Sequence, residues 1–152
     1  MSISARLAEL GIELPAVAAP VAAYVPAVVH AGLVLTSGQL PFTAGALPAT
    51  GKVGASVDAD DAKAYARTCA LNALAAAADA AGGVDRIAGV LRVGGFVASV
   101  PEFTGQPGVI NGASEVLGEI FGEAGRHARA AVGVPVLPLD SPVEVEVTFI
   151  LA

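Results

Sequence analysis

The chain has 152 residues, of which 55% are hydrophobic and 14% are charged. This length suits one compact domain, because a second core needs roughly 100 further residues, and the composition excludes a disordered chain or a coiled coil. Eight basic residues stand against 14 acidic ones, a net charge of −6, which disfavours electrostatic capture of nucleic acid. We therefore expect a single apolar-rich domain over residues 1–152.

The cysteine and histidine content argues against disulfides and metals. Cys69 is the single cysteine, and the chain has two histidines, His30 and His127, so neither an internal disulfide nor a metal-ligand cluster is expected. The first residues lack the apolar run of a secretory signal. Prolines and glycines interrupt the uncharged stretch 14–51, which argues against a membrane helix there. These features predict a cytoplasmic protein with no metal and no membrane attachment.

The first half of the chain predicts an arm, a hairpin and a long helix. Residues 3–11 have apolar side chains at helical spacing and form, with the linker up to residue 20, an expected helical arm. The runs 24–29 and 33–37 are β-rich, and the Gly32 between them suits a hairpin turn. After a loop over 41–57, a helix is expected from an Asp58 cap through alanines to Gly82.

The second half predicts a strand, a helix and two terminal strands. Residues 86–99 form the expected strand, in which Gly94-Gly95 suggests a bulge or a close approach by another backbone. A helix is expected over 110–124, followed by strands 129–136 and 143–151, which we interpret as a terminal hairpin. This order predicts an α+β fold with both long helices on one face of a sheet.

The terminal strands also hold the residues best suited to chemistry. Valines alternate with Glu144 and Glu146, so the valine face should meet the helices, and the acidic face should lie in water, at a subunit contact or around a site. Arg129 begins the preceding strand, and we expect it on the same side of the sheet as Glu144. An arginine offers a planar fork to a carboxylate, and a glutamate can activate water. A surface ion pair or a solvated acidic face explains the same pattern without chemistry.

Several motifs resemble the Rid (YjgF-like) family of small trimeric enamine/imine deaminases, formerly labelled L-PSP endoribonucleases. The resemblance runs from about Tyr24 to Leu151, and it is carried by LTSGQLP at 35–41, ARAAVGV at 128–134, Leu137-Pro138, and VEVEV at 143–147. It implies a chorismate-mutase-like sheet in a homotrimer with clefts between subunits. It also implies cofactor-independent hydrolysis of 2-imino or enamine acids to 2-keto acids and ammonia, as in 2-iminobutanoate/2-iminopropanoate deaminases. The N-terminal arm and the 42–57 loop resemble a longer-chain subgroup.

The resemblance also implies roles for single residues. Arg129 matches the arginine that holds the substrate carboxylate, and Glu144 the glutamate that positions and activates water. Ala131 stands where deaminases commonly carry a cysteine, and the match of Asn111 needs a one-residue insertion. The positions that match cleft-lining residues are Tyr24, Ser37, Gly38, Asn111 and Ala131. Without the resemblance, Tyr24 is equally a packed strand aromatic, Ser37 a turn hydroxyl and Asn111 a helix cap.

Two functions of different classes remain open, and a third ranks last. The first is hydrolysis of a small carboxylate-bearing imine by a homotrimer with no cofactor, no nucleic acid and no membrane. The second is a non-catalytic trimer that binds small carboxylate metabolites as a sensor or scaffold through the same Arg129. An endoribonuclease ranks last, because the chain is acidic and only 5% aromatic and offers no basic groove.

Overall fold

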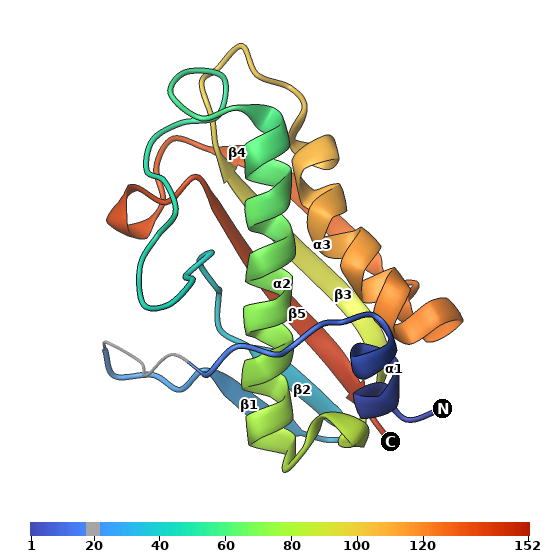
Figure 1. Cartoon of the computed structure of the whole chain (residues 1–152). Coiled ribbons are helices and arrows are strands. Elements are labelled where there is room, and N and C mark those ends of the chain that lie inside the picture. The colour runs from blue at the N-terminus through green and yellow to red at the C-terminus, as the bar shows by residue number, and fades with distance from the viewer. Residues whose placement is uncertain (18–21) are drawn as a thin grey trace.

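The computed structural model describes residues 1–17 and 22–152; the end of the predicted linker, with Pro20, lies outside the described residues. A five-stranded sheet is covered on one face by two long helices that lie side by side (Figure 1), as the α+β prediction required. The elements are α1 (Ile3–Glu9), β1 (Ala27–His30), β2 (Leu33–Thr36), α2 (Ala59–Ala81), β3 (Ile87–Ala98), α3 (Gln106–Phe121), β4 (Ala128–Val134) and β5 (Val143–Leu151), with short 3-10 turns η1 (Val84–Arg86), η2 (Gly122–Gly125) and η3 (Pro138–Asp140).

The strand order is β1-β2-β5-β3-β4, so the predicted terminal hairpin is wrong. β3 lies between β4 and β5, pairing parallel with β4 and antiparallel with β5. The reason is α3, which carries the chain back from the end of β3 so that β4 runs beside it in the same direction, as a crossover helix does. The chain must then cross past β3 to reach the position of β5. This order separates the two terminal strands that hold Arg129 and Glu144.

Two local predictions are confirmed by backbone geometry. The hairpin of β1 and β2 turns through Ala31 and Gly32, which both have positive φ angles, 49° and 78°, as a two-residue turn of the favoured hand requires. Helix α2 begins after Asp58, whose side chain accepts a hydrogen bond from the Asp60 amide, and ends at Gly82 in the left-handed conformation. Alanine, which favours the helix more than any other residue, is the commonest residue between these caps.

The boundaries of α3 and the interpretation of Gly94-Gly95 need correction. Helix α3 begins at Gln106 and ends at Phe121 instead of spanning 110–124. It begins earlier than expected because Pro107 suits the first turn of a helix, and it ends earlier because Gly122 has a positive φ of 59°. The irregularities of β3 lie between residues 87 and 92, while Gly94 and Gly95 keep regular register. The close approach at Gly95 comes from a side chain, since a Cβ there would lie 2.5 Å from Ile110.

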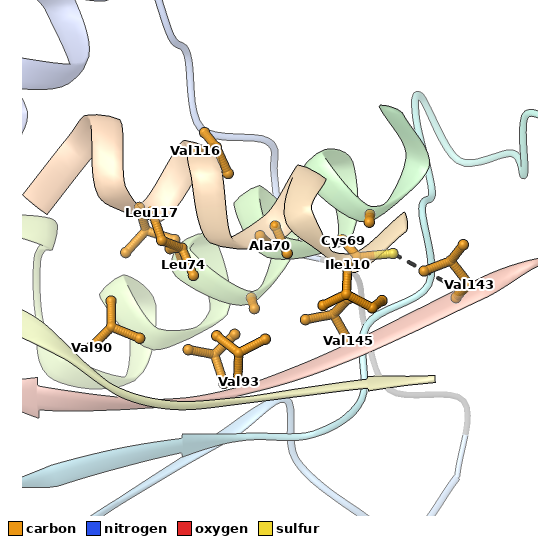
Figure 2. Close-up of a cluster of buried hydrophobic side chains, with 14 of the residues drawn as sticks. Cys69, Ala70, Leu74, Val90, Val93, Ile110, Val116, Leu117, Val143 and Val145 are labelled. Carbon is orange, nitrogen blue, oxygen red and sulfur yellow. Dashed lines mark hydrogen bonds between the residues drawn. The ribbon is translucent and has the colours of Figure 1, made fainter. Parts of the chain in front are cut away.

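The core lies between the helix pair and the sheet and consists mainly of small aliphatic side chains. Figure 2 shows Val93 and Val145 of the sheet beneath Leu74 and Ile110 of the helices. The thiol of Cys69 donates weakly to the Val143 carbonyl, and burial raises the pKa of that thiol. Cys69 is therefore the buried, unreactive residue that its alanine-rich surroundings predicted.

The predicted arm is present and is tied to the main body. Ser4 donates from its backbone and its hydroxyl to Asp85, both at 2.7 Å, and these bonds lower the pKa of the Asp85 carboxyl. Arg6 of α1 donates to the Glu119 carbonyl of α3. Among the described residues, no helix has both the length and the apolar character needed to cross a membrane.

The sheet face opposite the helices is apolar and exposed, apart from a row of charged side chains. Within the described part of the chain no helix covers it. Arg92 and Glu146 form an ion pair of 3.4 Å there. The aliphatic side chains beside this pair are more than a third exposed: Val28, Leu35, Val132 and Ile150. We call this surface the open face.

Candidate functional site

Arg129 lies on β4, an edge strand of the sheet, with its side chain held against α3. Its register partner on β3 is the buried Val93, so it lies on the helix side of the sheet. Nη1 donates to Asn111 Oδ1 at 2.8 Å and to Ser114 Oγ at 3.2 Å, and Nη2 donates to the Pro107 carbonyl at 3.3 Å. Residues 107, 111 and 114 follow helical spacing, so one stripe of α3 fixes the guanidinium.

The guanidinium of Arg129 has no acidic partner in the described chain and keeps part of its donor capacity. All three of its acceptors are uncharged. Six of the eight basic residues form ion pairs within the described chain, and the two that do not are Arg86 and Arg129. A guanidinium has five N–H donors, so the Nε donor and one Nη2 donor have no partner among the described residues. Charged N–H donors of this kind are the ones that bind a carboxylate.

Glu144 lies on the open face, close to the backbone of the loop that follows β2. A Cβ added to Gly38 would lie 1.9 Å from Glu144 Oε1, so the carboxylate rests on the space that a glycine leaves. Gln39 next to it pairs with Val145 through two backbone hydrogen bonds of 2.8 and 3.0 Å. The position of the Glu144 carboxylate therefore explains why residue 38 is a glycine.

The surroundings of Glu144 make its carboxylate a stronger base than an ordinary glutamate. The residue is half-buried, and this burial, with a smaller contribution from the negative charge of Glu146, raises the pKa of Glu144. Burial raises it because a charged carboxylate loses hydration in a low-dielectric environment. A carboxylate with a raised pKa accepts a proton from water more readily, as a general base must.

The expected meeting of Arg129 and Glu144 on one side of the sheet does not occur within the chain. Arg129 is level with Val93 on the helix side, whereas Glu144 pairs with Phe96 on the open face. β3 separates the two strands, and the registers differ by three residues along it. The prediction is wrong because it depended on a hairpin of the two terminal strands. Only adjacent strands would bring Arg129 and Glu144 together on one side of the sheet.

The predicted site residues form two groups, one at the β4 edge of the sheet and the other around β5 and the loop that follows β2. On the β4 edge, Asn111 contacts Arg129, and Ala131 lies two residues further along the strand on the same side. In the other group, the Ser37 hydroxyl donates to the Val25 carbonyl at 2.6 Å, which places Ser37 beside the segment of Tyr24. We call these the arginine group (Arg129, Asn111, Ala131) and the glutamate group (Tyr24, Ser37, Gly38, Glu144).

The geometry also shows which of the alternative, structural roles these residues have. Asn111 lies inside α3, not at its cap. Tyr24 precedes β1 and is 49% exposed, so it is not a packed strand aromatic. Ser37 lies just after β2 and outside any turn, and its hydroxyl donates across the hairpin to the Val25 carbonyl, so it is not a local turn hydroxyl. Glu146 forms the surface ion pair with Arg92.

Two polar residues beside Arg129 were not predicted as part of the site. Ser114 Oγ lies 2.9 Å from His127 Nε2, and His127 Nδ1 lies 2.6 Å from the Gly125 carbonyl oxygen. A helix serine and a loop histidine 13 residues apart carry no sequence motif, so no local signal predicted this contact. Across residues 1–17 and 22–152, no three His, Cys, Asp or Glu side chains converge to hold a metal ion.

The comparisons with known proteins agree with this architecture over nearly the whole chain. The family model described as "YjgF/chorismate_mutase-like, putative endoribonuclease" matches residues 4–150. The protein TCP17 of Trypanosoma cruzi is 44% identical over 145 residues, covering 95% of this chain and 91% of that protein. A crystal structure from Shewanella oneidensis, also described as a "putative endoribonuclease", has a TM-score of 0.94 at 36% identity and covers 99% of this chain and 100% of that one.

A more distant protein of similar structure contains a ligand. It is TdcF of E. coli with bound serine, at 25% identity and a TM-score of 0.63, covering 90% of this chain and 94% of that one. The family match spans almost all of the sequence and the sheet has the same chorismate-mutase-like architecture. The chain therefore belongs to the YjgF/chorismate mutase-like family.

Proposed function

We propose that the protein hydrolyses small 2-imino or enamine acids to 2-keto acids and ammonia. The observation that carries this proposal is the Arg129 guanidinium, which is fixed by three uncharged acceptors and has no carboxylate partner in the described chain. A cation held in this way at the edge of a sheet retains its positive charge and two donors for an incoming carboxylate. The bound serine of E. coli TdcF supports the proposal, because serine carries a carboxylate next to a nitrogen-bearing carbon.

A second copy of the chain is needed to complete such a site. The arginine group and the glutamate group lie on opposite faces of one sheet, so one chain cannot present both to one small molecule. The exposed aliphatic side chains of the open face favour contact with another copy. We infer a homotrimer in which the arginine group of one subunit faces the glutamate group of the next across a cleft.

The proposed reaction needs neither metal nor organic cofactor. Arg129 holds the substrate carboxylate and so fixes the imine carbon near Glu144 of the adjoining subunit. Glu144 takes a proton from water as the water oxygen bonds to the imine carbon. That proton passes to the imine nitrogen and gives a carbinolamine. Glu144 then moves the carbinolamine hydroxyl proton to the same nitrogen, and the C–N bond breaks so that ammonia leaves as the carbonyl forms. The products are one 2-keto acid and one ammonia for each water consumed.

An amino-acid oxidase assay tests the proposal directly. The oxidase generates a 2-imino acid in solution, and its decay is followed in the presence and absence of this protein. We expect the protein to accelerate imine loss with equal release of ammonia and 2-keto acid. An unchanged decay rate, with the keto acid still bound by the protein, would instead support the non-catalytic carboxylate-binding trimer.

The endoribonuclease reading fits the chain less well. The net charge is −6, and six of the eight basic side chains are engaged by acidic neighbours. Binding of a phosphate backbone depends on several free lysines and arginines in one groove. We expect no salt-dependent binding of single-stranded RNA in a filter or fluorescence assay.

Gly38→Ala is expected to displace the Glu144 carboxylate and leave the fold intact. The new Cβ would lie 1.9 Å from Oε1, and the flexible side chain must swing away from its position. Because proton transfer depends on the position of the base, we expect kcat to fall roughly tenfold or more. Gly118→Ala is the matched control, since a Cβ there meets nothing within 4 Å. Equal kcat values for both variants would contradict the placement of Glu144.

Glu146→Gln is expected to move the acidic limb of the pH–activity profile to lower pH. Glu144 must be unprotonated to act as a base, so activity falls as the pH drops through its pKa. Removing the charge of Glu146 removes the smaller of the two causes that raise this pKa, while burial remains. A nearby arginine from another subunit lowers the pKa in both proteins, so the sign of the difference is unaffected.

The control for this profile is Glu119→Gln, which removes the same charge from the helix side, where Glu119 pairs with Arg67. Its acidic limb should coincide with that of the wild type. A shift of the Glu146→Gln limb to higher pH, or an equal shift in both variants, contradicts the assignment of this limb to Glu144.

A further inference from the structure

Arg129 depends on a chain of hydrogen bonds that begins outside the candidate site. From Arg129 Nη1 the chain runs through Ser114 Oγ at 3.2 Å, to His127 Nε2 at 2.9 Å, and from His127 Nδ1 to the Gly125 carbonyl at 2.6 Å. Neither Ser114 nor His127 matches a residue that the family resemblance assigned to the cleft. We propose that Ser114 and His127 are positioning residues that hold the Arg129 guanidinium for a carboxylate substrate. This inference rests on the proposed function.

The backbone of η2 anchors the far end of this chain. A Cβ on Gly125 would lie 2.7 Å from the Leu117 carbonyl and 3.1 Å from Gly118 Cα. Glycine therefore allows η2 to pack directly against the backbone of α3, which fixes the direction of the Gly125 carbonyl. This carbonyl can only accept, so Nδ1 of His127 must carry the hydrogen.

The tautomer of His127 in turn sets the role of the Ser114 hydroxyl. In the neutral imidazole with hydrogen on Nδ1, Nε2 is an acceptor. The Ser114 hydroxyl must then donate to Nε2, and its remaining lone pairs are directed to Arg129 Nη1. A hydroxyl that is free to rotate would accept from Arg129 only part of the time. His127 thereby converts Ser114 into a permanent acceptor for Nη1.

This arrangement determines which donors of Arg129 remain for substrate. Asn111 and Ser114 accept from Nη1 and the Pro107 carbonyl accepts from Nη2, so Nε and part of the capacity of Nη2 remain for a substrate. Loss of the Ser114 acceptor leaves the guanidinium held only by Asn111 and the Pro107 carbonyl, which fixes its orientation less tightly. We therefore expect weaker carboxylate binding with little change in the chemical step, because Glu144 is untouched.

Two substitutions of His127 separate its roles by geometry. The Asn amide nitrogen reaches the place of Nδ1 and can keep the bond to Gly125, but it offers nothing at Nε2. The Gln side chain reaches the place of Nε2 and can accept from Ser114. His127→Asn and Ser114→Ala should each raise KM for a 2-imino acid and Kd for pyruvate about three- to tenfold. His127→Gln should remain within about twofold of the wild type, and kcat should change little in all three.

Nitrogen-15 NMR of the histidine rings supplies a readout that does not depend on activity. The chain has two histidines, and a His30→Gln variant assigns the signals. At neutral pH we expect the His127 ring to carry its hydrogen on Nδ1 in the wild type. Hydrogen on Nε2, or unchanged Kd for pyruvate in both His127→Asn and Ser114→Ala, overturns the proposal. If the wild type binds pyruvate with these dependences but does not hydrolyse imines, the proposed function alone fails.

Discussion

Replacing Arg129 with Ala is expected to lower kcat/KM for a 2-imino acid about 100- to 1000-fold. Two charge-assisted hydrogen bonds to a carboxylate contribute about 3–4 kcal/mol together, and 1.4 kcal/mol corresponds to a factor of ten. Arg129→Lys keeps the charge but loses the planar fork, so it should fall between Arg129→Ala and the wild type. The measurement is the initial rate of ammonia release in the oxidase-coupled assay.

The control for Arg129→Ala is Arg86→Ala. Arg86 is the other basic residue without an ion pair in the described chain, and it is exposed at the end of η1. Its replacement should leave kcat/KM within about twofold of the wild type. Near-normal turnover by folded Arg129→Ala, or an equal loss in Arg86→Ala, contradicts the role assigned to Arg129.

Gly112→Ala is expected to destabilise the fold by about 3 kcal/mol or more, which is the high end for overpacking in a core. At this residue α2 and α3 are in backbone contact, since a Cβ would lie 1.9 Å from the Lys63 carbonyl oxygen and 3.2 Å from the Arg67 amide. The backbones can make room for this Cβ only if α2 and α3 move apart. Chemical denaturation monitored by circular dichroism measures the free energy of unfolding.

Gly118→Ala is the matched control for Gly112→Ala, because it makes the same change in the same helix. A Cβ at residue 118 meets nothing within 4 Å. Alanine is favoured over glycine inside a helix, so the variant should gain about 0.5–1 kcal/mol. Similar free energies of unfolding for the two variants would show that α2 and α3 are not in backbone contact at Gly112.

The sequence predicted elements whose signals are local. Asp58 and Gly82 mark the ends of α2 because a cap and a left-handed terminus each depend on one residue. The alternation of valine and glutamate placed the core side of β5 correctly, since the period of two is a property of the strand itself. The family motifs grouped Arg129 with Asn111, which the structure brings into contact.

The sequence did not predict the order of the strands. A strand's residue pattern specifies which side is buried but not which strand lies beside it, and consecutive strands are usually neighbours. Here the parallel pairing of β4 with β3 places β3 between Arg129 and Glu144. The contact of Ser114 with His127 could not be predicted from the sequence either, because it depends on how η2 packs against α3.

The separation of the two groups changes how the family resemblance applies to this chain. A pair expected to act within one subunit instead lies on opposite faces of its sheet. In the proposed trimer, catalysis and oligomerisation are the same requirement, because each cleft would take its cation from one subunit and its base from another. A monomeric variant should fold and yet be inactive.

Subunit complementation tests this central claim most directly. Arg129→Ala and Glu144→Gln are each expected to be nearly inactive as pure proteins. When the two are unfolded together, mixed equally and refolded, about one cleft in four combines an intact Arg129 with an intact Glu144, as random assembly of a symmetric ring requires. We predict recovery of about a quarter of wild-type activity. No recovery, in a mixture in which tagged subunits of both kinds purify together, would contradict a site shared between subunits.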